Sequence, residues 1–205
     1  MRIGIDFDNT LVGYDELFRA VAIERGLLPS TLVGGKKALR DMLRLRPGGE
    51  DEWTRLQADV YGRRMADARI IEGASSFIGA CRANGAEVFV VSHKTRHAAA
   101  DPSVDLHQSS LAWMEAHGFF DPARLALTRG LIFFEPTRDA KCRRIAQLGC
   151  THFIDDLEEV FQEPSFPPGV ERLLLHRASE APPRGPFATY SDWNAISDAI
   201  FDAAR

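Results

Sequence analysis

The chain has 205 residues, of which 45% are hydrophobic and 26% are charged. This is enough for one sizeable core and a small appended subdomain, but not for two large domains. The formal net charge of -4 is unlike the uniformly basic surface of a nucleic-acid-binding protein, so we expect a small-molecule partner and no nucleic acid.

The cysteine content and the lengths of the apolar segments indicate the cellular compartment in which the protein is expected. The three cysteines contain no CxxC pair, and their odd number indicates free thiols in a reducing compartment. The N-terminal segment becomes charged after a few residues, which is not typical of a secretory signal. No run approaches the roughly 20 apolar residues that a membrane span needs. We therefore expect a cytoplasmic protein with no membrane partner.

The chain opens with an apolar run over residues 3–7, which is typical of a buried parallel strand. Asp6 lies within this run and Asp8 directly follows it. Sheets of α/β proteins place their sites at the carboxyl ends of such strands. Over residues 13–70 apolar residues instead recur at helical spacing, with a break at 47–49. This pattern predicts a small helical insertion.

After residue 70, short apolar runs alternate with helical patterns. Strands are predicted over 87–91, 131–134, 151–154 and 172–175, helices over 74–83, 138–148 and 193–201, and a surface loop over 181–186. The alternation predicts an α/β fold with a Rossmann-like parallel sheet flanked by helices. The predicted core domain comprises residues 1–12 and 71–205, and residues 13–70 form a helical insertion after the first strand.

Two carboxylates follow the first strand. Because alternate residues of an extended strand point to the same side, Asp6 and Asp8 can both face one ligand at the edge of the sheet. The alternative is a solvated strand end or a pair of turn-forming residues. Taken alone, this pair of residues does not decide between the two.

A second acidic pair, Asp155 and Asp156, follows the predicted strand 151–154. Two carboxylate clusters on neighbouring strands are costly unless a cation neutralises them, and magnesium is the natural candidate because it prefers hard oxygen ligands. Asp156 can also be the N-cap of a helix that starts at Leu157. Both interpretations are compatible with Asp155 as a metal ligand.

Phosphoryl transfer to a carboxylate also needs donors for the phosphoryl oxygens. Ser92 follows the predicted strand 87–91, and Lys141 lies near the start of a helix that leads to the Asp155 strand. Separately, such a serine is usually a turn residue and such a lysine is usually solvated. Lys94, two residues after Ser92, is the alternative to Lys141 as the lysine that faces the phosphate. The spacing to Asp155 favours Lys141.

These residues together resemble a known family. The segment from Asp6 to Thr10, then Ser92, Lys141 and the pair Asp155-Asp156 stand in the order and context of the four motifs of the haloacid dehalogenase-like (HAD) superfamily. The similarity extends from the first strand to at least Asp156, and its most specific part is the first motif. The resemblance implies a magnesium-dependent phosphatase with a small helical cap.

The resemblance also implies residue roles. Asp6 would attack phosphorus and form an aspartyl-phosphate, while Asp8 would protonate the leaving oxygen and then activate the hydrolytic water. Asp6, the Asp8 carbonyl and Asp155 would bind Mg²⁺. Thr10 would brace the loop at the phosphate site.

The phosphoryl oxygens would be held by Ser92, the backbone N–H of His93 and Lys141. Lys94 and Arg96, which follow Ser92 closely, are candidates for substrate specificity because they can bind a second anionic group. Lys and Arg outnumber Asp and Glu in the insertion, which suits an anionic substrate. One side of a predicted helix there is basic, and we favour a solvated stripe over a substrate-binding patch for this side. Its residues are Lys36, Lys37, Arg40 and Arg44.

The carboxylate at Asp8 narrows the branch of the family. Members that are dehalogenases lack it, and ion-pumping members have Asp-Lys-Thr at the first motif. We therefore predict a phosphomonoester hydrolase that acts on a nucleotide or a sugar phosphate. A phosphomutase would use the same residues, whereas a non-catalytic phosphate-binding or partner-binding module would need neither Asp6 nor Asp8.

Overall fold

The computed structural model describes residues 1–28, 35–177 and 181–202. Contacts between residues divide the chain into two units. Unit 1 comprises Met1–Val12, Ile70–Lys94 and Gly118–Arg205, and unit 2 comprises Gly13–Arg69 and Thr95–His117. None of the described helices is long and apolar enough to cross a membrane.

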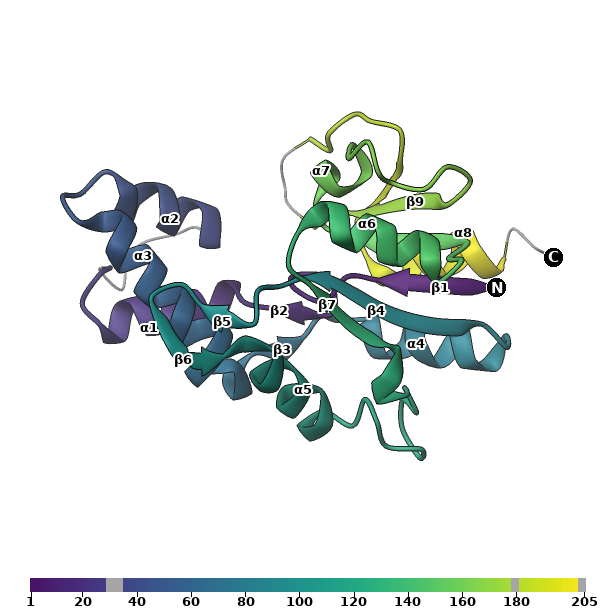
Figure 1. Ribbon diagram of the computed structural model, residues 1–205, viewed down its shortest axis with the longest axis horizontal. Helices are drawn as coiled ribbons and strands as arrows, with labels where there is room; N and C mark the ends of the chain where they lie inside the picture. The colour runs from purple at the N-terminus through teal and green to yellow at the C-terminus, as the bar shows by residue number, and fades with distance from the viewer. Residues whose placement is uncertain (29–34, 178–180, 203–205) are drawn as a thin grey trace. The chain divides into compact units, whose positions relative to one another are not determined.

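Unit 1 is built on a six-stranded sheet in which all neighbouring strands are parallel (Figure 1). In spatial order the strands are β10 (Ala188–Tyr190), β9 (Glu171–Leu175), β8 (His152–Asp155), β1 (Arg2–Ile5), β4 (Glu87–His93) and β7 (Ile132–Glu135). The first strand of the chain therefore lies in the interior of the sheet, between β8 and β4. This architecture confirms the predicted Rossmann-like α/β fold.

Helices cover the sheet of unit 1. They are α4 (Ala74–Ala83), α6 (Arg138–Gln147), α7 (Glu158–Phe161) and α8 (Trp193–Phe201), with a 3-10 turn η3 (Arg129–Leu131) before β7. Residues of α6 and α7 share one apolar cluster with Phe89 of β4 and Phe153 of β8. The other pair, α4 and α8, pack together through Phe77 and Trp193, whose ring centroids lie 4.8 Å apart. Strands that are buried in this way read as continuous apolar runs, which is why the sequence reveals them.

The predicted strands and helices of unit 1 agree with the structure to within about two residues at their ends. Strand β10 is absent from the prediction, because it is a three-residue edge strand, Ala-Thr-Tyr, without an apolar run. The predicted loop over 181–186 contains neither helix nor strand. All three cysteines are buried and unpaired.

Unit 2 combines helices with an antiparallel hairpin. Its elements are α1 (Asp15–Glu24), α2 (Lys36–Arg44), α3 (Gly49–Ala58), the π-helical turn η1 (Asp59–Arg63), the 3-10 turn η2 (Met65–Asp67), the hairpin of β5 (His97–Ala98) and β6 (Asp101–Asp105), and α5 (Leu106–Ala116). Two short strands, β2 (Val12–Gly13) and β3 (Arg69–Ile70), form a separate two-stranded sheet where the chain passes from one unit to the other.

The division by contacts differs from the predicted domains, because residues 95–117 lie in unit 2 and not with the α/β core. The reason is packing within unit 2. The indole N–H of Trp113 donates to the Ala68 carbonyl at 2.9 Å. An apolar cluster joins the same two segments of the chain; it contains Ala58, Ala98, Val104 and Leu106. These contacts connect residues that are far apart in sequence, so residue spacing does not reveal them.

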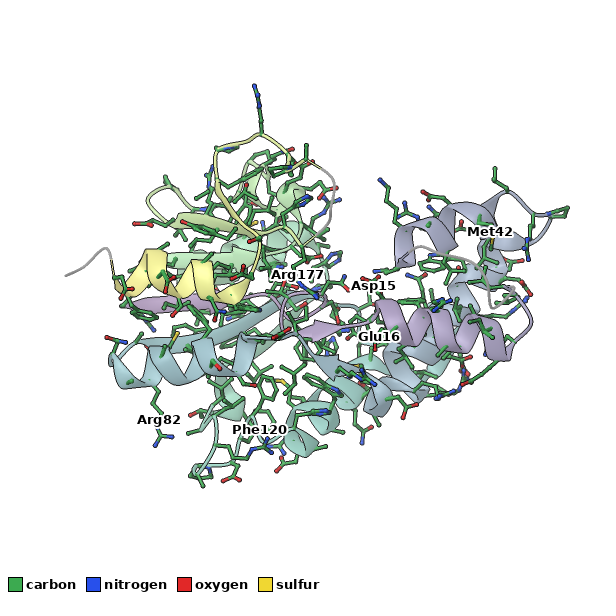
Figure 2. All side chains as sticks on the ribbon, turned by 180° about the vertical axis from the view of Figure 1, so that it is seen from behind. Asp15, Glu16, Met42, Arg82, Phe120 and Arg177 are labelled. Atoms are coloured by element: carbon green, nitrogen blue, oxygen red, sulfur yellow. The ribbon has the colours of Figure 1, made fainter. Side chains whose placement is uncertain are left out.

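The N-termini of two helices of unit 2 are tied together. Asp15 and Glu16 occupy the first turn of α1 (Figure 2), where acidic side chains favour the helix dipole. The Asp15 carboxylate accepts a hydrogen bond from the backbone N–H of Lys36, the first residue of α2, at 2.9 Å. This bond satisfies one of the amides that a helix N-terminus leaves without an intrahelical partner.

Two arginines on the basic side of α2, Arg40 and Arg44, are paired with acids. The Arg44 guanidinium binds the Glu50 carboxylate through two hydrogen bonds, at 2.5 and 2.9 Å. The Arg40 Nε donates to Asp41 at 3.0 Å. Because these charges are already matched on an exposed surface, the contacts favour the solvated stripe over a substrate-binding patch.

Candidate active site

Two neighbouring strands of unit 1 end in aspartates that lie side by side. β1 and β8 are in parallel register with Ile5 opposite Ile154, and the Asp6 amide continues the ladder by donating to the Ile154 carbonyl at 2.9 Å. Asp155 is the next residue on β8, and both aspartates are buried. The register therefore brings the two carboxylates together at the carboxyl edge of the sheet.

The chain turns sharply after Asp8. Asn9 has a φ of 56°, in the left-handed region that asparagine adopts more readily than most residues. The amides of Leu11 and Val12 both donate to the Phe7 carbonyl, at 3.0 and 3.1 Å, which closes the turn. Asp8 lies at the rim as a result. Its side chain is 24% exposed, compared with 6% for Asp6, so Asp8 is the more accessible of the two carboxylates.

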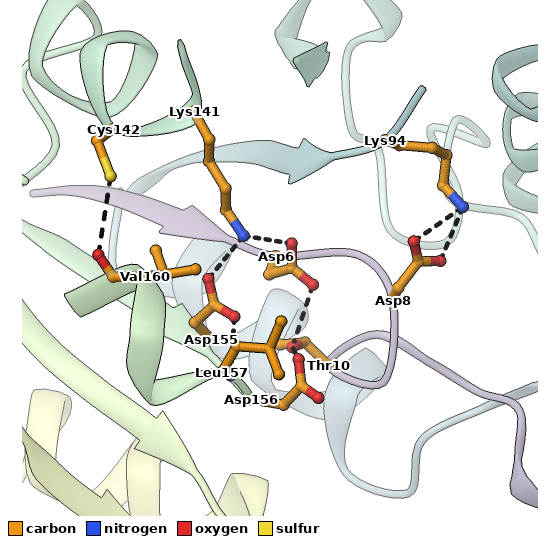
Figure 3. Close-up of polar contacts among 10 residues, drawn as sticks. All are labelled: Asp6, Asp8, Thr10, Lys94, Lys141, Cys142, Asp155, Asp156, Leu157 and Val160. Carbon is orange, nitrogen blue, oxygen red and sulfur yellow. Dashed lines mark hydrogen bonds and ion pairs between the residues drawn. The ribbon is translucent and has the colours of Figure 1, made fainter. Parts of the chain in front are cut away.

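Lys141 lies in the first turn of α6, whose N-terminus is capped by the Thr137 side chain. Its buried ammonium group donates to Asp6 Oδ1 at 2.5 Å and to Asp155 Oδ2 at 2.6 Å (Figure 3). Burial by itself lowers the pKa of Lys141, but the negative charges of Asp155 and Asp6 outweigh burial and raise that pKa above its usual value. The lysine therefore stays protonated and joins the two strand ends.

The cluster carries more negative charge than one ammonium group balances. Burial raises the pKa of Asp155 to about 7, and the nearby charge of Asp6 adds to this increase, although Lys141 and the Leu157 amide oppose it. A carboxyl group whose charged form is disfavoured next to another carboxylate is a suitable place for an added cation.

Asp156 lies in the same cluster. The Thr10 hydroxyl is 3.4 Å from Asp156 Oδ1 and 3.5 Å from Asp6 Oδ2, so it bridges the first motif and the second acidic pair (Figure 3). The prediction that Asp156 caps the following helix is wrong. The N-cap of α7 is Leu157, without a side-chain cap bond, and the Leu157 amide donates to Asp155 instead.

Three carboxylates of this cluster can share one metal ion. Asp6, Asp155 and Asp156 each offer an oxygen, and these oxygens lie within 4.8 Å of one another. Magnesium prefers hard oxygen ligands and keeps several of its waters, so it needs few protein ligands. The donor set and its spacing therefore fit Mg²⁺. The carboxylate of Asp8 is not one of these three, and Asp8 was predicted to bind the metal through its backbone carbonyl. The Asp8 carboxylate contacts a lysine instead.

That lysine is Lys94. Its Nζ lies 2.9 Å from Asp8 Oδ1 and 2.8 Å from Asp8 Oδ2 (Figure 3). The two candidate lysines are thus both at the site but contact different aspartates, Lys141 the first aspartate of the motif and Lys94 the second. Sequence spacing did not predict this second pair, since 86 residues separate its members.

The other predicted phosphate-site residues lie at the end of β4. Ser92 is buried and stands opposite Phe134 in the register with β7. The ring of His93 is exposed, and its Nε2 lies 3.1 Å from the Pro136 carbonyl. Both residues are therefore on the strand next to β1, at the same edge as Asp6.

Two further residues bear on the site. Arg96 belongs to unit 2, where its guanidinium Nε donates to Asp105 at 3.2 Å. Trp193, which the motifs do not suggest, is buried at the start of α8, and its indole N–H donates to the Thr10 carbonyl at 3.2 Å. The C-terminal helix thus helps to hold the loop that carries Asp8.

No protein-family model matches the sequence, and no curated protein matches it. Solved structures do match across almost the whole chain. A HAD family hydrolase from Deinococcus radiodurans R1, solved with bound phosphate and sodium, has a TM-score of 0.61 and 17% identity, and the match covers 99% of this chain and 96% of that chain. YfnB from Bacillus subtilis, bound to magnesium, has a TM-score of 0.56 and 11% identity, covering 98% of both chains. CbbY from Rhodobacter sphaeroides, in complex with phosphate, has a TM-score of 0.54 and 14% identity, covering 95% of both chains.

Similarity at these identities shows the fold. The chain has the fold of the HAD superfamily hydrolases, with its acidic cluster at the carboxyl edge of the parallel sheet. This confirms the fold that the sequence motifs implied.

Proposed function

We propose that this protein is a phosphoric monoester hydrolase that uses Asp6 as a covalent nucleophile on a small phosphorylated metabolite. The observation that carries the proposal is the convergence of Asp6, Asp155, Asp156 and Lys141 at one strand edge, with Asp8 two residues beyond the nucleophile. A structural ion pair would need only one of these acids beside the lysine.

In the first step, a carboxylate oxygen of Asp6 attacks phosphorus, and the bond from phosphorus to the ester oxygen breaks. Asp8 gives its proton to the departing oxygen, so the alcohol leaves neutral and the phosphoryl group stays on Asp6. In the second step Asp8 takes a proton from water, whose oxygen attacks phosphorus. The bond between phosphorus and the Asp6 oxygen breaks, which regenerates the Asp6 carboxylate and releases inorganic phosphate. The exposure of Asp8 at the rim supports this role, because it must reach both the leaving group and water.

The remaining residues hold charge in place. Lys141 and Ser92, with the backbone N–H of His93, would bind the phosphoryl oxygens as negative charge builds up on them. Thr10 would brace the loop through its contacts with Asp6 and Asp156. Mg²⁺, when bound by Asp6, Asp155 and the Asp8 carbonyl, would neutralise phosphate charge, and Asp156 is a further ligand by its place in the cluster.

We also propose that unit 2 acts as the cap that chooses the substrate. A cap that covers a site excludes water and adds contacts remote from the reacting atoms. The excess of Lys and Arg, which suits an anionic ligand, is confined to the 13–70 part of the chain, because the acids of residues 95–117 offset it within unit 2 as a whole. Two of the structures with the same fold contain phosphate, which agrees with a phosphate ester as substrate.

The test is a screen of phosphate esters, including nucleotides and sugar phosphates, with Mg²⁺ and with a chelator. We expect magnesium-dependent release of inorganic phosphate, which Asp6→Asn abolishes. Asp198→Asn, an exposed aspartate on α8, is the matched control and should keep full activity.

Each alternative has its own signature in this screen. Conversion of a sugar phosphate to an isomer without net phosphate release would identify a phosphomutase. Full turnover by Asp6→Asn would contradict the covalent mechanism. Phosphate binding without turnover on any ester would identify a binding module.

A further inference from the structure

The lysine beside Asp8 is held in one place. Lys94 follows directly on β4, and its backbone N–H donates to the Glu135 carbonyl of β7 at 2.9 Å, which extends the sheet by one residue. The Nζ at the other end of the side chain lies 5.6 Å from the centre of the Phe7 ring and contacts both oxygens of Asp8. Phe7 is itself fully buried and packs edge to face against Phe134.

The exposed fraction of Lys94 separates two possible roles. A lysine that selects a distant group of the substrate must present its ammonium to the substrate-binding space, but the Lys94 side chain is only 4% exposed. Its ammonium is directed at Asp8, whose side chain is the more accessible member of the pair. The contacts therefore favour a role through Asp8 over direct recognition of a second anionic group.

The loop that carries Asp8 explains why such a partner is useful. Asp8 lies in a tight turn at the rim, where a carboxylate on a short side chain can rotate away from the reacting oxygen. A misplacement of about 1 Å can cost about a hundredfold in rate. A buried cation that binds the carboxylate restricts this rotation. Lys94 contacts both oxygens of Asp8, and when Asp8 is protonated, contact with one oxygen is enough to hold the group while the other carries the proton.

We infer that Lys94 is a positioning residue for Asp8: it fixes the carboxylate that protonates the leaving oxygen, and it does not itself bind the substrate phosphate. The inference rests on the proposed phosphatase function. It assigns the two lysines of the site to different steps, Lys141 to the nucleophile and the phosphoryl group, and Lys94 to the leaving group.

The test compares two aryl phosphates that differ mainly in their leaving group, p-nitrophenyl phosphate and phenyl phosphate. The poorer leaving group, phenol, depends more on protonation. We expect Lys94→Met to lower kcat for phenyl phosphate by about tenfold more than for p-nitrophenyl phosphate, with KM changed less than about threefold. Lys94→Arg, which keeps the charge, should recover part of kcat.

A double-mutant cycle shows whether Lys94 acts through Asp8. The double variant Asp8→Asn/Lys94→Met should lose no more activity than Asp8→Asn alone, because the lysine then has no carboxylate to position. Multiplying losses would overturn the inference, as would a rise in KM with unchanged kcat in Lys94→Met. Inorganic phosphate, measured as a competitive inhibitor, should bind Lys94→Met within about threefold of the unmodified protein.

Failure of the inference is distinguishable from failure of the proposed function. If the unmodified protein hydrolyses both esters and Asp6→Asn does not, but Lys94→Met behaves like the unmodified protein, only the inference is overturned. If the unmodified protein hydrolyses no phosphate ester, the proposed function fails and the inference fails with it. Circular dichroism of each variant identifies any loss of activity that comes from unfolding.

Discussion

Unit 1 and unit 2 each bury an aspartate against basic side chains, but they balance its charge differently. In unit 2, Asp59 at the start of η1 pairs with both Arg25 and Arg63, and Arg63 also pairs with Asp101, so the charge of the buried acid is matched. In unit 1, Lys141 is the one basic residue among those described that pairs with Asp6 and Asp155, and Asp156 lies within the same cluster. A buried acid matched by its partners is typical of a structural ion pair, whereas a surplus of buried acids needs a ligand.

The largest expected effect comes from removing the only ammonium group that contacts Asp6 and Asp155 within the described part of the chain. Lys141→Met leaves these buried carboxylates without that partner, and we expect the free energy of unfolding to fall by about 3–5 kcal/mol. Urea unfolding followed by circular dichroism measures the loss. A loss below about 1 kcal/mol would mean that the cluster is already balanced by other groups.

Magnesium should then stabilise unit 1 selectively. At a concentration one hundred times its Kd, a ligand that binds only the folded state adds about 2.7 kcal/mol to the free energy of unfolding. We expect this increase in the unmodified protein and in Asp198→Asn, and its loss in Asp155→Asn. Unfolding in magnesium and in chelator gives the difference, and an unchanged midpoint in the unmodified protein would contradict the metal site.

The matched pair in unit 2 should behave as structure alone. Asp59→Asn removes the charge that both arginines contact, and we expect a loss of about 1–3 kcal/mol of stability. Because no deficit of positive charge exists there, magnesium should restore none of this loss, and kcat should stay within about threefold of the unmodified value. A collapse of kcat in a folded Asp59→Asn variant would show that the comparison between the units is wrong.

The smallest effect is expected on the exposed basic side of α2. Arg44→Gln breaks the ion pair with Glu50, and we expect no measurable change in the unfolding midpoint or in kcat/KM. The Glu50→Gln variant is the matched control. A fall in kcat/KM for Arg44→Gln alone would restore the alternative that this side of the helix binds substrate.

Local patterns were sufficient for most elements of unit 1. Its interior strands are largely buried and read as apolar runs, and its longer helices are separated from them by turn residues, so short stretches of sequence carry their own signal. Strand β10 escaped prediction because it has no apolar run, and residue spacing does not indicate that residues 95–117 contact residues 13–69. β10 depends on pairing with β9, and α5 depends on contacts such as that of Trp113 with Ala68.

The sequence by itself determined the order of the candidate catalytic and binding residues along the chain. These residues, Asp6, Asp8, Ser92, Lys141 and Asp155, each lie in or directly after an element whose pattern is local, so their approach to one edge of a parallel sheet could be anticipated. Only the tertiary structure decided which side chains these residues contact. The contacts of Lys141 with two strand ends, of Lys94 with Asp8 and of Trp193 with Thr10 arise from the register and packing of distant segments. Hydrogen bonds form between atoms within about 3 Å, and only the folded chain brings those atoms so close.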